Sequence, residues 1–471
     1  MAITIQQYPE QLNMANSDLL WLVTSDSSSA PQYQFICALQ DGCGNTLTTI
    51  KQQPNPSDKG VFNLGRIVKQ YLDYDNYALT IGDVGSLFNK NTDTAKFFKV
   101  AFGEEYGTSP SSSVTSYTGI GSNTGNPAQT GSLPYYYLID GVVDPNDGSF
   151  NWNTSSFWYP NEATPSSATF SRNIALTDAP RTQYAKDADY LSISFLNGNL
   201  NSATSSAQDV RWVEYTFYSA SVAYDSASFS NENNTNNSNL GGPVTSSAGL
   251  FSTAATVQTC LTASGNQTSG SLLIHLGISP QNLIDNGNVT GITGSWDYYT
   301  VKLYPQDSVQ QGFFNPNGVW DSFTIYKQTG NCQYPGVRFG WINDYGVWDY
   351  FNFVLQEDKN TVVDRGLYRQ NFVDYSTTSN GVTYDRERRG NNAYYTNISA
   401  NFTANSDWLN QAQADWLEGL FISPNVYIQD GTNWLPVIIT DTEFTSKTNP
   451  RTQKLFKYTV NYILANNKRS R

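Results

Sequence analysis

Short runs of aromatic and β-branched residues, separated by clusters of Asn, Gly, Ser and Pro, recur along the whole chain and constrain its fold more than any other feature. Runs of roughly four to eight such residues favour strands, and the clusters between them favour turns. Ala, Leu, Glu and Lys, which favour long helices, are scarce here. The sequence therefore predicts a mainly β protein with several β-sandwich or barrel modules.

The length of 471 residues is enough for about three domains of ~150 residues each. Two stretches rich in Ser, Asn, Gly and Thr, residues 107–132 and roughly 225–249, lack apolar periodicity. They are expected to be surface loops, inter-domain crossings, or segments that order against a neighbouring subunit. The predicted modules are an N-terminal β domain (1–107), a β domain with these long loops (108–250), a β-sandwich (251–356) and a C-terminal α+β domain (357–471).

The C-terminal module is predicted to contain one helix and one antiparallel hairpin. Residues 406–423 favour the helix, with Ser406 as its N-cap and Pro424 beyond its end. Residues 434–444 and 454–463 favour the hairpin, because apolar and polar residues alternate in its second strand. Near the start, apolar residues at helical spacing between 67 and 72 predict one short helix.

Charge limits the partners that the chain can have. The 27 basic and 40 acidic residues give a net charge of −13, and only 14% of residues are charged. Because a nucleic-acid or anionic-membrane binder needs a basic face, we expect neither partner. No apolar run reaches about 18 residues, and the first 23 residues carry no signal-peptide pattern, so we expect no membrane insertion and synthesis in a cytoplasm.

Few residues are suited to catalysis or metal binding. His275 is the single histidine, and its apolar, strand-like surroundings predict a hydrogen-bonded strand residue instead of a base or a ligand. The four cysteines form no CxxC pair, and no phosphate-binding or dinucleotide-binding motif is present. We therefore expect no catalytic residue, no metal and no cofactor, and a protein that is not an enzyme.

Glycoside hydrolysis stays open as a weaker alternative, because it needs only two carboxylates across a cleft. Candidate pairs by proximity alone are Glu104 and Glu105, Asp187 and Asp189, and Asp344 and Asp349. Such pairs are also ordinary on solvated surfaces, so a polysaccharide depolymerase is the third hypothesis for this chain.

Aromatic side chains make up 14% of the chain and offer a second kind of site. One group lies near loop segments and could contact a glycan, or could pack in a sandwich core and at subunit interfaces. This group comprises Tyr135, Tyr136, Tyr137, Trp152, Trp158 and Tyr159.

Residues 341–351 predict a hairpin. Asn343 suits the turn, Gly346 supplies a permissive backbone, and Asp349 is expected to cap the turn through backbone N–H groups. We expect this motif to be structural first and an interface second. Its residues are Trp341, Asn343, Gly346, Trp348, Asp349 and Tyr350.

Three stretches together resemble a known family. They are KQQPNPSDKGVFNLGRIVKQYL near the start, VRFGWINDYGVWDYFNF in the centre, and DWLEGLFISPNVYIQDGTNWLPVIITDTEFTSK with KLFKYTVNYILAN at the end. The central stretch carries an aromatic–Leu/Ile–Asn–x–x–Gly–x–x–Asp–aromatic signature. All three are similar to segments of tail-associated virion structural proteins of tailed bacteriophages of Bacteroidota-type hosts.

The resemblance implies a tail, tail-tip or baseplate-like component of a virion, assembled in the host cytoplasm. Its partners would be other virion proteins and copies of itself. The low charge agrees with assembly, because interface cores are depleted of charged residues. The second hypothesis is a receptor-binding adhesin that recognises host surface glycans.

Overall fold

The computed structural model describes residues 3–10, 12–42, 45–74, 87–90, 93–107, 135–142, 175–196, 210–230, 260–261, 267–268, 273–287, 289–305, 319, 321–329, 336–355, 357–371, 373–375, 381–384, 387, 390–443 and 455–466. Within these residues the protein is mainly β, as the sequence predicts. It divides into two compact units, Met1–Thr329 with Trp341–Tyr350, and Gly330–Gly340 with Phe351–Arg471. The sequence predicts four modules, which is a finer division of the chain than these two units, and the four modules stay a prediction.

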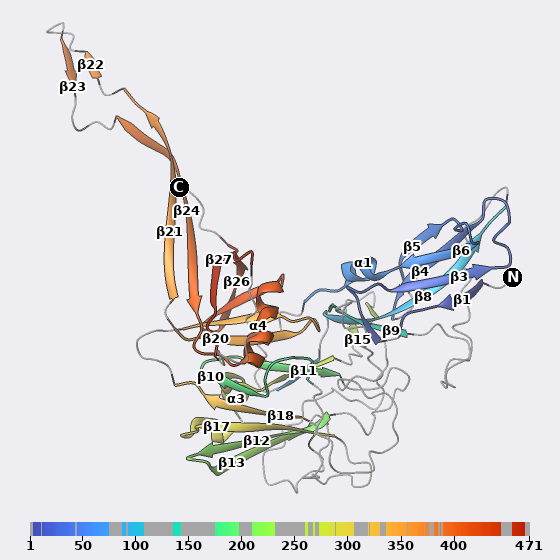
Figure 1. The fold of residues 1–471 in the computed structure, drawn as a ribbon, viewed down its shortest axis with the longest axis horizontal. Coiled ribbons are helices and arrows are strands. Elements are labelled where there is room, and N and C mark those ends of the chain that lie inside the picture. The colour runs from blue at the N-terminus through green and yellow to red at the C-terminus, as the bar shows by residue number, and fades with distance from the viewer. Residues whose placement is uncertain are drawn as a thin grey trace. The chain divides into compact units, whose positions relative to one another are not determined.

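Two sheets at the N-terminal end of the first unit enclose one hydrophobic core (Figure 1). The smaller sheet has the order β1 (Ile3–Gln7), β3 (Leu20–Ser25), β6 (Lys59–Asn63). The larger sheet has the order β2 (Leu12–Met14), β9 (Tyr135–Ile139), β8 (Ala95–Glu105), β4 (Gln34–Asp41), β5 (Thr46–Gln52). Trp21 of the smaller sheet contacts Tyr136 of the larger one edge-on, with ring centroids 5.3 Å apart.

The short helix predicted near residue 67 is present. It is formed by α1 (Gly65–Val68), which continues into the 3₁₀ helix η1 (Lys69–Tyr71). Val68 and Leu72 are buried in the N-terminal core, which explains why the helical spacing of these apolar residues was informative.

Two further sheets complete the first unit. The five-stranded sheet has the order β10 (Thr182–Ala185), β18 (Asp321–Lys327), β17 (Tyr298–Pro305), β12 (Val210–Ser219), β13 (Val222–Ser230). The three-stranded sheet has the order β11 (Ser192–Leu196), β16 (Leu273–Gly277), β7 (Phe88–Lys90). The hydroxyl groups of Tyr215 and Tyr299 on the buried face of the five-stranded sheet donate to the carbonyls of Gly277 and Ile278. Smaller elements are the pair β14 (Cys260–Leu261) and β15 (Gln267–Thr268), the helix α3 (Pro280–Asn286) and the 3₁₀ helix η2 (Thr290–Thr293).

One boundary of the predicted loops is wrong. The stretch expected to be a loop from about residue 225 begins inside β13, which continues to Ser230 because its backbone pairs with β12. Residues 108–132 and 231–249 lie outside the described part of the chain.

A seven-stranded sheet carries the C-terminal part of the chain. Its order is β20 (Trp348–Phe353), β19 (Val337–Ile342), β25 (Val426–Asp430), β26 (Asn433–Ile439), β27 (Thr459–Leu464), β24 (Asn391–Asn405), β21 (Glu357–Arg369). The predicted C-terminal hairpin is confirmed as the antiparallel pair β26–β27. In the second unit, α4 (Gln411–Ile422) places Trp416 edge-on to Phe351 of β20, with 5.9 Å between ring centroids.

The helix α4 ends where the sequence predicts and begins later than predicted. Asn410, not Ser406, is its N-cap, and Asn410 and Gln413 exchange side-chain-to-backbone hydrogen bonds in a capping box. Ser406 instead accepts a hydrogen bond from the backbone N–H of Tyr458. The turn before the helix is held by the bridge between Leu409 and Phe456, a contact between distant segments that local sequence does not reveal. None of the helices in the described residues has the length and apolar character to cross a membrane.

His275 is a hydrogen-bonded strand residue, as predicted. It lies in β16, is 1% exposed, and its Nδ1 is 2.7 Å from the hydroxyl oxygen of Ser194 on the adjacent strand β11. Burial lowers the pKa of His275 to about 4. The charged imidazolium is therefore disfavoured in the folded protein.

We predict that His275 makes the folded state less stable in mild acid. Above the ordinary pKa of 6.5 the imidazole is neutral in both states, so its contribution is constant. As the pH falls from about 6.5 towards 4, the unfolded state binds a proton that the folded state resists, and about 3 kcal/mol of stability is lost. Urea denaturation of the wild type and of His275→Gln at several pH values isolates this contribution. Parallel stability curves for the two proteins between pH 7 and 4 would contradict it.

Candidate interaction surface

Two residues of the aromatic group that could contact a glycan lie instead in the hydrophobic core. Tyr136 and Tyr137 are fully buried in β9, in two different hydrophobic clusters, so the glycan-contact alternative is wrong for both. Their alternation across β9 places one ring on each face of a sheet that is covered on both sides. The side chain of Tyr135 and residues Trp152, Trp158 and Tyr159 lie outside the described residues.

The hairpin motif forms the turn between β19 and β20. The Asn343 side chain accepts hydrogen bonds from the N–H groups of Tyr345 and Val347, and so caps the turn. Gly346 has φ of +75°, and a Cβ there would lie 2.2 Å from the carbonyl oxygen of Asp140. Asp349, the residue predicted as the cap, accepts a 2.6 Å hydrogen bond from the Thr177 hydroxyl.

The remaining motif residues are buried. Trp341, Trp348 and Tyr350 are all at most 3% exposed, and the hydroxyl groups of Tyr350 and Ser192 lie 2.9 Å apart. The structure therefore places the strand residues of this motif in the interior of the protein, and Asn343 of the turn is partly buried.

Five of the six candidate catalytic carboxylates take part in the following contacts within the fold, and the sixth, Asp344, is exposed. Glu104 is buried and accepts hydrogen bonds from the hydroxyls of Ser25 and Tyr33. Asp189 is buried and accepts from the backbone N–H of Lys186. Ion pairs join Glu105 to Lys51 and Asp187 to Lys327, and Asp349 contacts Thr177 as described. In the described residues no cluster of three or more His, Cys, Asp and Glu side chains could hold a metal ion.

A row of four tyrosines crosses the outer face of the five-stranded sheet. Tyr184, Tyr326, Tyr298 and Tyr218 are successive cross-strand neighbours on β10, β18, β17 and β12. Ring centroids along this tyrosine row are 5.8, 5.1 and 4.6 Å apart. The rings of Tyr218 and Tyr298 are nearly parallel, at 8°, so their faces cover each other. The most exposed rings are Tyr184, at 49%, and Tyr326, at 38%.

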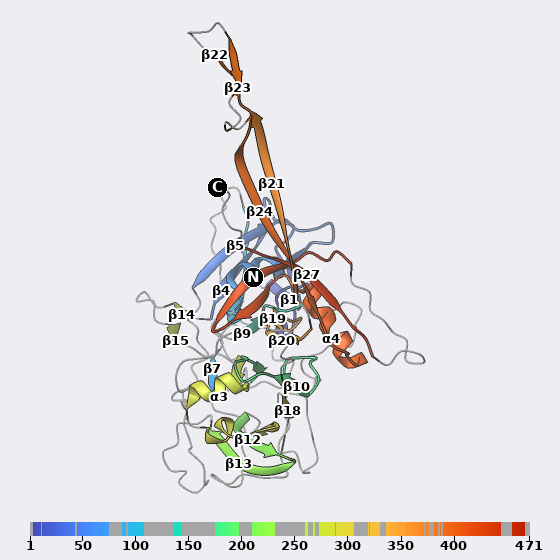
Figure 2. The same cartoon turned by 90° about the vertical axis from the view of Figure 1, so that its left-hand side faces the viewer.

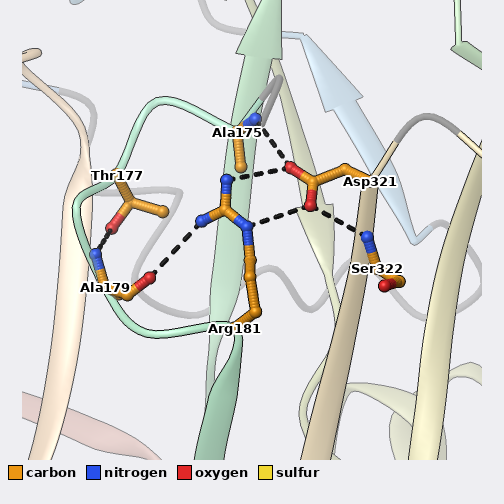
Figure 3. Close-up of polar contacts among 6 residues, drawn as sticks. All are labelled: Ala175, Thr177, Ala179, Arg181, Asp321 and Ser322. Carbon is orange, nitrogen blue, oxygen red and sulfur yellow. Dashed lines mark hydrogen bonds and ion pairs between the residues drawn. The ribbon is translucent and has the colours of Figure 1, made fainter. Parts of the chain in front are cut away.

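An ion pair between Arg181, just before β10, and the buried Asp321 of β18 joins the strand that carries Tyr184 to its parallel neighbour (Figure 3). Arg181 binds both carboxylate oxygens of Asp321, with distances of 2.9 and 3.0 Å. Asp321 is 2% exposed and also accepts hydrogen bonds from the backbone N–H groups of Ala175 and Ser322. Burial raises the pKa of Asp321, and the guanidinium and N–H donors oppose this rise. The pair thus supplies the partners that a buried carboxylate requires.

The most exposed element in the described chain is a two-stranded ribbon formed by β21 and β24, which we call the arm. The two strands pair from Glu357–Ala404 to Arg369–Asn391. β24 also pairs with β27, but only over Asn401–Asn405, and no other described strand pairs with its outer part. Within their sheet β21 and β24 extend well beyond β26 and β27 (Figure 1 and Figure 2). The short antiparallel pair β22 (Val373–Tyr375) and β23 (Val382–Tyr384) lies between β21 and β24 in the sequence.

Large apolar side chains are exposed along the arm. Leu367 is 61% exposed and Tyr394 is 66% exposed. Val362 and Val363, which alternate between the two faces, are also exposed. The arm therefore presents apolar groups to solvent on both of its faces.

The arm has chemically different faces. Strand alternation and the register place Asp358, Val362, Asp364 and Tyr368 on one face, which we call the acidic face. Lys359, Val363, Arg365, Leu367 and Arg369 lie on the other, which we call the basic face. Two contacts confirm the assignment. The Tyr395 hydroxyl approaches Asp364 on the acidic face, and the Lys359 ammonium lies 5.5 Å from the Phe402 ring centroid on the basic face.

A β-bulge interrupts the arm near its outer end, where Tyr394 is the extra residue of β24. The rings of Tyr394 and Tyr395 cover Gly366, and a Cβ at this glycine would lie 2.2 Å from the Tyr395 ring. A side chain at residue 366 would therefore displace one or both of these rings.

Sequence reasoning missed the arm. Both strands are exposed on both faces, so neither shows the apolar–polar alternation by which a half-buried strand is recognised. One available signal was charge, since residues 391–405 carry none while residues 357–369 carry six charged side chains.

We predict that Arg181→Met destabilises the protein by about 3–5 kcal/mol, because it leaves the Asp321 carboxylate buried without its cation. Adding Asp321→Asn recovers part of this loss, since no charge then remains buried. Lys51→Met, which breaks the half-exposed Lys51–Glu105 pair, is the matched control and costs about 1 kcal/mol or less. Urea denaturation measures all four proteins. Equal effects of Arg181→Met and Lys51→Met would contradict the prediction.

Comparison of the sequence with protein-family models and with curated proteins finds no match to either. The functional interpretation therefore rests on the resemblance of the three sequence segments and on the surfaces of the molecule itself, chiefly the arm and the tyrosine row.

Proposed function

We propose that this chain is a structural protein of a tailed-phage virion, a tail, tail-tip or baseplate-like component that acts through subunit assembly and not as an enzyme. The resemblance of three segments to such proteins supplies the class of particle. The observation that carries the assembly role is the arm, with its exposed apolar side chains on both faces.

Elementary energetics support an assembly role for the arm. A ribbon of two strands is at best marginally stable by itself in water, and β24 shares only its five base residues with a third strand. Exposed leucine, valine and tyrosine side chains gain free energy when a partner covers them, at ~25 cal/mol per Å² of apolar area. A protein surface covers the arm most economically, because it can pair with the strands and bury the side chains together.

The test is the location of the protein in the virus particle. Antibodies raised against the full-length chain, coupled to gold, are expected to label intact or gently opened virions at one defined place along the tail. Mass spectrometry of purified virions should find the chain in multiple copies. Its absence from purified particles, together with its presence in infected cells, would overturn the proposal.

Glycan binding by an adhesin is the second candidate, and the tyrosine row is the observation that favours it. Tyr184 lies at the edge of the five-stranded sheet, next to Tyr326, and these two rings are the most exposed of the row. An exposed aromatic ring can stack on the apolar face of a sugar.

The glycan proposal predicts binding of host surface polysaccharide that depends on these two rings. The double variant Tyr184→Ser with Tyr326→Ser is expected to lose binding on a glycan array roughly tenfold or more, because each stacking contact contributes about 1 kcal/mol. Val222→Ser, at an exposed position of the same sheet outside the row, is the control and should bind like wild type. Binding that is unchanged in the double variant would exclude the tyrosine row as the site.

A further inference from the structure

We infer that the arm binds a second copy of this chain, with the acidic face of one arm against the basic face of the next. This inference rests on the proposed assembly role and names the partner for it. The arm is the element concerned because its two faces carry opposite charge and both expose apolar side chains.

The charges of the arm are sorted by face. In the described arm, the acidic face carries Asp358 and Asp364 and no basic residue. The basic face carries Lys359, Arg365 and Arg369, with Glu357 as its one acid. Glu357 lies at the base, where it accepts a hydrogen bond from the Tyr462 hydroxyl. The net charges of the two faces are therefore −2 and +2.

Complementary charge identifies the partner as another copy. Two acidic faces would repel each other, and so would two basic faces, whereas unlike faces attract. Residues 357–405 hold six acidic and six basic residues, so the whole net charge of −13 lies elsewhere in the chain. The net negative charge of the chain therefore makes copies repel each other on average, and residues 357–405, with balanced charge, add nothing to that repulsion.

Apolar contacts would add to this attraction. Val363 and Leu367 on the basic face would meet Val362 and Tyr368 on the acidic face of the neighbouring arm. All four side chains are exposed in the isolated chain. Their burial, with charged groups at the margin, gives the apolar centre and polar rim of a protein interface.

Contact between unlike faces has a consequence for symmetry. Each arm keeps one face unused after it binds a neighbour, so the contact is heterologous and repeats from copy to copy. It generates a closed ring or a continuing stack, and not a two-fold dimer.

The test uses two charge-inverted variants of the full-length chain. The first, Asp358→Lys with Asp364→Lys, makes both faces basic. The second, Lys359→Glu with Arg365→Glu and Arg369→Glu, makes both faces acidic. Wild type is expected to form oligomers that grow with concentration in analytical ultracentrifugation. Each variant alone should associate more weakly by roughly a hundredfold, because like charges then face one another.

Mixing supplies the decisive measurement. An equimolar mixture of the two variants is expected to recover oligomers, because every contact then joins a basic face to an acidic one. Asp26→Lys with Asp430→Lys changes the net charge of the chain as the first variant does, at exposed positions outside the arm, and should assemble like wild type. Far-UV circular dichroism confirms that every variant is folded.

The outcomes that would contradict this inference differ from the outcomes that would contradict the proposed function. Wild type that stays monomeric, or a mixture that stays dissociated, would overturn copy-to-copy contact through unlike faces. If antibodies still locate that protein in the virion tail, the assembly role stands and a different virion protein covers the arm.

Discussion

Backbone pairing at the base of the arm is the interaction on which this part of the molecule depends. Over Asn401–Ala404, β24 lies between β21 and β27, so the base of the ribbon is the edge of a seven-stranded sheet. Side-chain hydrogen bonds reinforce that edge, from Thr403 to Asn461 and from Thr459 to Asn405. Beyond this base the ribbon has only its own cross-strand pairs. The free energy gained when a partner covers the ribbon is therefore greatest in its outer part.

Aromatic side chains serve two purposes in this protein, and burial separates them. Trp21, Phe35 and Tyr136 fill the core between two sheets. In contrast, Tyr184 and Tyr326 lie on the solvent-facing side of a sheet, where they pack against neighbouring rings of the tyrosine row. The same residue types with the same β propensity therefore cannot be assigned to core or surface from composition, because the assignment depends on which face of a sheet meets a second layer.

Local signals in the sequence predicted local structure. The mainly β class, the short helix near residue 67 and the antiparallel hairpin near the C-terminus follow from spacing and alternation within a few residues. The start of α4 was misplaced because Ser406 and Asn410 are both good capping residues, and the distant Phe456 decides between them. The opposite charge of the arm faces appears only when residues 357–369 are known to form one continuous strand that is exposed on both faces, although all six charged residues are plain in the sequence.

The Arg181–Asp321 pair also sets an order of events during synthesis. Its partners are 140 residues apart, and β10 finds its parallel neighbour only when β18 has left the ribosome. At translation rates of ~5–20 residues per second, β10 waits for about 7–28 s. During that interval its arginine and its edge have no native partner, so the five-stranded sheet cannot be completed before β18 has been made.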